Sequence, residues 1–102
     1  MAGYDGGHIA LSFSSSGDNT VVAAQSGKTI RVHAIALTAA SPVTVALKDG
    51  ASTTLGSFQN VSSLSIDQFD GAPRYVLTSG NAFIINLGSA VSCTGTLWYT
   101  VY

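Results

Sequence analysis

Apolar residues alternate with polar ones in short segments of this chain, and Gly, Asp, Asn, Ser or Pro interrupts them about every eight to twelve residues. That spacing is typical of a β-sandwich or a β-barrel. Nowhere do apolar residues repeat at helical spacing over three turns, so no helix is expected. The sequence therefore predicts an all-β, single-domain, antiparallel β-sandwich. A jelly-roll-like topology is favoured because it leaves few open sheet edges, while the order of the strands does not follow from the sequence.

About eight or nine strands are expected, after a Gly-rich segment at residues 1–7 that is expected to be a flexible arm. The expected strands are residues 8–14, 19–24, 28–39, 42–48, 53–58, 61–66, 74–78, 82–87 and 91–102. The β-sandwich domain would thus span residues 8–102. A chain of 102 residues fits one domain with one modest core.

The longest expected strand, residues 28–39, changes its alternation midway. Apolar side chains occupy even positions up to Val32 and odd positions from Ile35 onward. Because side chains in a strand alternate with period two, this change needs a β-bulge or a strand buried on both sides. A bulge or bend is therefore predicted near His33 and Ala34, where the strand could pass from one sheet to the other.

Two further positions carry local signals. Pro42 is expected to begin a strand, where its missing N–H is tolerated. Asp49-Gly50 predicts a hairpin, because both central residues of a type I′ turn have positive φ and this dipeptide favours that conformation.

Charge is scarce in this chain. Four Lys and Arg residues face five Asp residues, there is no Glu, and the formal net charge is −1. Soluble domains carry about a quarter of their residues as charge, and net charge keeps identical molecules apart. A surface this neutral indicates a protein that is covered by partners, that is, a building block of an assembly.

The same composition excludes other classes. No Lys/Arg cluster could neutralise nucleic-acid phosphates, and no apolar run approaches the roughly 20 residues needed to cross a bilayer. The first residues lack a basic region followed by an apolar core, so no signal peptide is expected. A single Cys allows no disulfide within the chain, which suits synthesis in a reducing cytoplasm.

Residues that could carry catalysis are few and scattered. No Ser lies in a Gly-x-Ser-x-Gly elbow, and His8 and His33 are expected to pack or to contact a neighbour. Asp67 and Asp70 lack the ligand pattern of a calcium loop and are expected to shape a turn. Cys93 has no basic neighbour and is expected to be a buried, inert thiol. The sequence predicts no enzyme, no metal and no cofactor.

The aromatic residues near the end of the chain support two interpretations. Tyr75, Trp98, Tyr99 and Tyr102 could line a carbohydrate-binding face, or some of them could form a contact between subunits. If Leu97 and its alternate neighbours fill the core, Trp98 and Tyr102 point outward together. The contact between subunits is the favoured interpretation. The candidate interface residues are Trp98, Tyr102, His33, Arg31 and Tyr4.

Four blocks carry a resemblance to a known family: SGDNTVVAA at residues 16–24, SGKTIRV at 26–32, SGNAFIINLGSAV at 79–91 and GTLWYTVY at 95–102. With these turn–strand–turn blocks the chain resembles small virion-associated proteins of tailed bacteriophages. The resemblance implies a β-sandwich that assembles as a homotrimer on the surface of the phage capsid, after synthesis in the host cytoplasm.

The function implied by this resemblance is capsid decoration, or cement, in which the protein bridges neighbouring major capsid proteins. A tail or head-fibre component is the nearest variant. The resemblance carries no catalytic residue onto this chain.

Overall fold

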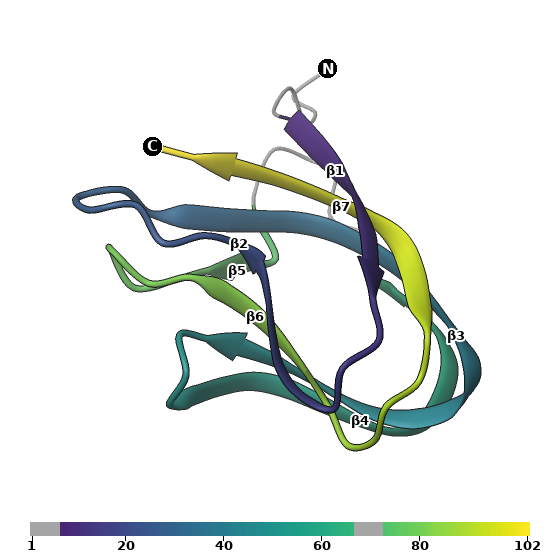
Figure 1. Cartoon of the computed structure of the whole chain (residues 1–102). Helices are drawn as coiled ribbons and strands as arrows, with labels where there is room; N and C mark the ends of the chain where they lie inside the picture. Colours follow the sequence, from purple (N-terminus) through teal and green to yellow (C-terminus); the bar gives the residue numbers. More distant parts are fainter. Residues whose placement is uncertain (1–6, 67–72) are drawn as a thin grey trace.

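The computed structural model describes residues 7–66 and 73–102, and in these ranges the protein is all-β and antiparallel, as predicted (Figure 1). The strands are β1 (Gly7–Phe13), β2 (Gly17–Val22), β3 (Ile30–Asp49), β4 (Thr53–Ile66), β5 (Tyr75–Val76), β6 (Phe83–Leu87) and β7 (Cys93–Val101). Residues 1–6 of the predicted arm lie outside the described residues, and Gly7 begins β1.

The described residues form seven strands, fewer than the eight or nine expected, because two pairs of expected strands are continuous. Residues 28–39 and 42–48 merge into β3, and residues 53–58 and 61–66 merge into β4. The sequence predicted a break between the members of each pair. Instead, the register between β3 and β4 shifts there, and both strands continue. Pro42 lies in β3 between Thr38 and Val43, where the register with β4 is interrupted, so its missing N–H costs no ladder bond.

The strands make one curled sheet in the order β1-β7-β3-β6-β2, with β4 and β5 paired to β3. β3 is long enough to serve both halves of this sheet: its first half pairs with β7 and its second half with β6. The curl brings the two halves face to face around the core, as in a β-sandwich (Figure 1). The jelly-roll topology stays a prediction.

The predicted bulge is present. The register between β3 and β7 shifts between Val32 and Ala34, so that His33 is the extra residue. The bulge keeps β3 in one sheet and turns the apolar residues on both sides of it toward the same core: Ile30, Val32, Ile35 and Leu37 are all buried. The change of parity in the sequence is therefore the signature of a bulge and not of a strand that changes sheets.

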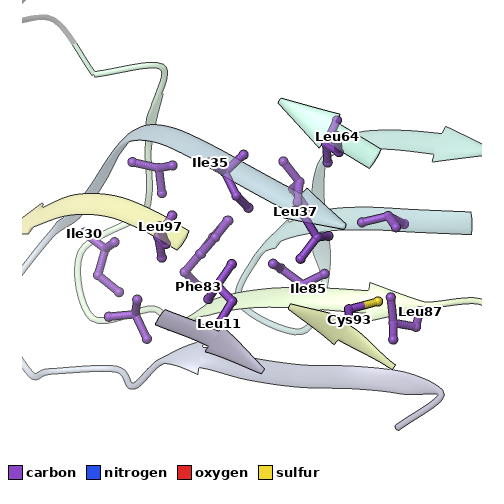
Figure 2. Packing of buried hydrophobic residues seen from close by; sticks show 14 of the residues in the cluster. Leu11, Ile30, Ile35, Leu37, Leu64, Phe83, Ile85, Leu87, Cys93 and Leu97 are labelled. Atoms are coloured by element: carbon purple, nitrogen blue, oxygen red, sulfur yellow. The ribbon is translucent and has the colours of Figure 1, made fainter. Parts of the chain in front are cut away.

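The core lies inside the curl, where side chains from β1, β3, β4, β6 and β7 point toward one another (Figure 2). Phe83 and Leu97 are fully buried at its centre. Cys93 is also fully buried, as predicted, and burial raises the pKa of its thiol. In β7 the predicted inward face is confirmed, since Tyr99 and Val101 pack with Leu97 against this core.

β7 passes very close to β3 at Gly95. A Cβ atom at this position would overlap the carbonyl oxygen of Ala36 and approach the Cα atom of Leu37 to 2.9 Å. Only glycine allows the two backbones to pair at this distance, which gives Gly95 a packing role inside the sheet.

The Asp49-Gly50 signal marks a real hairpin, which joins β3 to β4 through residues 50–52. The predicted type I′ turn was wrong, because Asp49 pairs with Thr53 as the last residue of β3 and leaves a three-residue loop. Gly50 has positive φ, and Asp49 does not. The side chain of Asp49 is instead buried against the turn that precedes β6.

Candidate functional site

The side of the sheet that faces away from the core is almost free of charge across β1, β7, the first half of β3 and the end of β4. We call this side the outer face. Its residues alternate with the core residues and lie in register across the four strands. They are His8, Ala10 and Ser12 of β1, Thr94, Thr96, Trp98 and Thr100 of β7, Arg31, His33, Ala34, Ala36 and Thr38 of β3, and Ser63 and Ser65 of β4. Two of them, His33 and Ala34, are buried within the chain.

Small side chains dominate this outer face. Thr38 and Thr94 are directly opposite each other, and their hydroxyl oxygens lie 3.3 Å apart. The only formally charged residue on the outer face is Arg31. A neutral sheet face of Ala, Ser and Thr lets another protein surface approach closely without removing charges from water.

Arg31 marks the end of the outer face where larger side chains gather. The Arg31 guanidinium carbon lies 4.0 Å from the centre of the Tyr102 ring, and its Nη1 donates to the Tyr102 main-chain oxygen at 3.3 Å. On its other side Arg31 pairs with Val76 of β5. Among the described residues, Val76 (55% exposed) and Tyr102 (66%) are the exposed large hydrophobic residues. Both therefore flank the same arginine.

The bulge adds His33 to this group. His33 is buried, and its Nε2 lies 3.3 Å from the Thr100 hydroxyl, which belongs to the same outer face. The next residue, Ala34, pairs with Trp98, whose side chain is half-buried. We call Arg31, His33, Val76, Trp98, Thr100 and Tyr102 the outer patch.

The structure thus brings together four of the five predicted interface residues: Arg31, His33, Trp98 and Tyr102. The fifth, Tyr4, lies outside the described residues. Val76 was missed, because the sequence indicates a strand at residues 74–78 without indicating that β5 pairs with β3.

A carbohydrate platform built from all four aromatic rings would need those rings on one face. Tyr75 and Tyr99 pack against the core, so they do not share the outer face with Trp98 and Tyr102. Trp98 and Tyr102 remain on that face, and residues of these two types are also enriched where proteins contact each other.

A second feature is a groove of about 150 Å³ between β1 and β2. Its lining is Ile9, Ala10, Leu11, Ser12 and Phe13 of β1 with Thr20 and Val21 of β2. No lining residue carries a charge, and the only polar side chains are the hydroxyls of Ser12 and Thr20. The groove offers apolar surface and backbone groups and no acid–base pair.

The second half of β3 has an ion pair and hydrogen-bonded carboxylates, which the outer face lacks. Lys48 forms an ion pair with Asp18 at 3.0 Å, and the Asn86 amide donates to Asp18 at 2.7 Å. These contacts, the Asn86 hydrogen bond first, lower the pKa of Asp18. In the described part of the chain this is the one ion pair.

Asp49 is the buried carboxylate of this half of β3. The Thr78 backbone N–H and hydroxyl each donate to its Oδ2 at 2.9 Å, and the Asn81 amide donates to its Oδ1 at 3.0 Å. Burial alone would raise the pKa of Asp49, but these hydrogen bonds outweigh it and lower the pKa. Asp49 therefore fastens the turn at residues 78–81 to the end of β3 and has a structural role.

In residues 7–66 and 73–102 no three His, Cys, Asp or Glu side chains are grouped so that they could hold a metal ion. Asp67 and Asp70, the carboxylates weighed for a calcium loop, lie outside the described residues. No helix in the described ranges is long and apolar enough to span a membrane.

Comparison with known proteins does not assign a family: no protein-family model and no curated protein matches the chain.

Proposed function

We propose that this protein is a structural component of a phage particle, a capsid decoration or cement protein that binds the head surface as a homotrimer and reinforces contacts between major capsid proteins. The observation that carries the proposal is the outer face: four paired strands present Ala, Ser and Thr to the surroundings with one charged residue among them. An uncovered face of this kind offers little protection against self-association, so a bound neighbour is its natural state.

The size of the outer face supports repeated, symmetric use. Four strands about 4.8 Å apart and some seven residues long make roughly 400 Å² of sheet. A specific interface buries about 800 Å² on each partner. One outer face is therefore too small for tight binding alone. A trimer that engages a shell at three equivalent points gains the additional affinity through avidity.

The outer patch supplies the anchor residues. Trp, Tyr and Arg are the residues that most often dominate binding energy at protein interfaces. Here Trp98, Tyr102 and Arg31 lie at one end of the uncharged face, and the Tyr102 ring holds the Arg31 guanidinium in place. In this proposal the outer patch anchors the contact between subunits, and the rest of the outer face approaches the shell.

The proposal is tested in two measurements on purified protein. Native mass spectrometry and light scattering at micromolar concentration are expected to give the mass of a trimer. Mixing with undecorated phage shells is expected to give uptake that saturates at a fixed number of copies per shell. A monomer that is not taken up by shells, and that binds immobilised saccharides instead, would establish the carbohydrate-binding alternative.

A further inference from the structure

β1 and β2, the two ends of the described path β1-β7-β3-β6-β2, do not pair with each other. In the described part of the chain β1 pairs with β7 alone, and β2 pairs with β6 alone. Among residues 7–66 and 73–102, each of these strands therefore has one edge without a neighbouring strand. The two strands diverge from the turn at residues 14–16 (Figure 1), and both free edges border the groove of about 150 Å³.

The lining of this groove shows that it follows the backbone edge of β1. Five consecutive residues of β1, Ile9 through Phe13, contribute to it. Successive side chains of a strand point to opposite faces, so a cavity over one face would be lined by every second residue. Because residues from both faces of β1 line this groove, it lies along the backbone edge of the strand, over about 17 Å.

The edge of β1 has none of the features with which proteins block strand addition. β1 contains no charged residue and no proline, and its register with β7 is unbroken from Gly7 to Phe13. β2 is less suited to pairing, because it carries Asp18 and has a bulge between Thr20 and Val22. Ile9, Phe13 and Val21 pack against the core but stay half-buried at this opening.

We infer that this groove is a docking site for an extended, uncharged arm of a partner protein, which adds to the sheet as a strand beside β1. The arm would pair with the β1 edge through its backbone and would complete the burial of the half-buried residues with alternate apolar side chains. The uncharged lining fits an uncharged arm, since a charge placed there would be desolvated without a partner.

The geometry favours a single extended arm as the occupant of the groove, and not the edge strand of a second copy of this protein. β2 borders the groove opposite β1, so an added strand would have β2 on its far side. A strand that brings its own sheet neighbours would meet β2, and every described strand of this protein already has such neighbours. In the proposed function the arm belongs to the shell protein, and to that extent the inference rests on that function.

The test uses purified, isotopically labelled protein and a synthetic peptide, acetyl-Thr-Val-Thr-Ile-Thr-Val-Thr-amide. The control peptide has proline in place of the central isoleucine, which removes a backbone donor. With saturating peptide, amide hydrogen exchange in β1 is expected to slow at least tenfold, with a smaller effect near Thr20 and Val21. The control peptide is expected to have no effect.

Two variants separate the groove from the rest of the surface. Ser12→Lys places a charge in the groove and is expected to weaken peptide binding at least tenfold. Ser57→Lys is the matched control, because Ser57 is also an exposed serine of a strand and lies outside both the groove and the outer face. It is expected to bind the peptide as the wild type does.

The inference is overturned if exchange in β1 does not slow, if the proline peptide acts equally well, if the effect falls on β4, or if both lysine variants bind alike. A doubling of protein mass with exchange slowed in β1 in the absence of peptide would also overturn it, in favour of a second copy. These results are independent of the proposed function, because shell uptake by the wild type is measured without the peptide.

Discussion

The two halves of β3 belong to one strand, but their charged side chains make different kinds of interaction. In the second half, Lys48 is paired with Asp18, and Asp49 receives three hydrogen bonds from Thr78 and Asn81. In the first half, Arg31 lies against the ring of Tyr102 and beside the exposed Val76. The second half completes its polar interactions within the chain. The first half presents a stacked guanidinium, exposed apolar groups and a neutral face, which are the features on which the proposed function rests.

The difference also extends to how the strands are held. The first half is fixed by the close approach of β7 and by the bulge at His33, which are backbone features. The second half is fixed by side-chain hydrogen bonds to a turn. The following changes disturb one half at a time and are ordered from the largest expected effect to the smallest.

Gly95→Ala is expected to have the largest effect on folding. The added Cβ would overlap the backbone of Ala36, and backbone atoms cannot move aside as a side chain can. We expect a loss of about 3 kcal/mol in the free energy of unfolding, the upper range for an overpacked site. Urea denaturation measures it. Gly7→Ala in β1 is the control, since no atom lies within 4 Å of its added Cβ; equal stability of the two variants would contradict the close approach.

Asp49→Ala is expected to cost about 2 to 3 kcal/mol, because the donors of Thr78 and Asn81 lose a buried acceptor. The pKa of Asp49 is lowered in the folded protein, so its contribution to stability is complete above the ordinary Asp pKa of about 3.9. It is lost as the pH falls through the lowered value, because protonation then favours the unfolded chain.

The pH dependence gives the sharper form of this prediction. Thermal melts from neutral pH down to about pH 3 are expected to show a shallower loss of Tm in Asp49→Asn than in the wild type, since Asn does not titrate. Asp18 contributes acid sensitivity to both proteins and serves as the common background. Parallel curves of Tm against pH for the two proteins would show that ionisation of Asp49 does not stabilise the folded protein.

Local sequence signals account for much of the fold. The change of parity between Val32 and Ile35 predicted the bulge, and the alternation around Leu97 separated the inward residues of β7 from Trp98 and Tyr102. These predictions succeed because period-two alternation reports directly which face is buried. The fold brings four of the five candidate interface residues close together, and their role in an interface stays a prediction.

What the sequence did not predict depends on pairing between distant segments. The pairing of Val76 with Arg31 and the hydrogen bond from Thr78 to Asp49 both join residues that are far apart in the chain. Local periodicity carries no information about which strands become neighbours. The continuity of β3 through Pro42 was missed for a related reason, since a proline that lies where the ladder is interrupted has the same local signature as one at the start of a strand.

Trp98→Ala tests whether the first half of β3 and its neighbour β7 form a contact surface. Because Trp98 is half-buried on the outer face, we expect its removal to weaken subunit association at least tenfold, about 1.4 kcal/mol, and to lower Tm by only a few degrees. Sedimentation equilibrium measures the first quantity and a thermal melt the second. An unchanged oligomer mass combined with a large loss of Tm would show that Trp98 acts within the fold.

Lys48→Met is expected to have the smallest effect and completes the comparison. The ion pair with Asp18 is partly open to solvent, and pairs of this kind contribute little to stability because water and salt screen them. We expect a small decrease in Tm at low salt that disappears at high salt, while oligomer mass and shell uptake stay unchanged. If Lys48→Met reduced association as strongly as Trp98→Ala, both halves of β3 would have to face partners. The distinction between a half whose charges are paired within the chain and a half that is prepared for a neighbour would then fail.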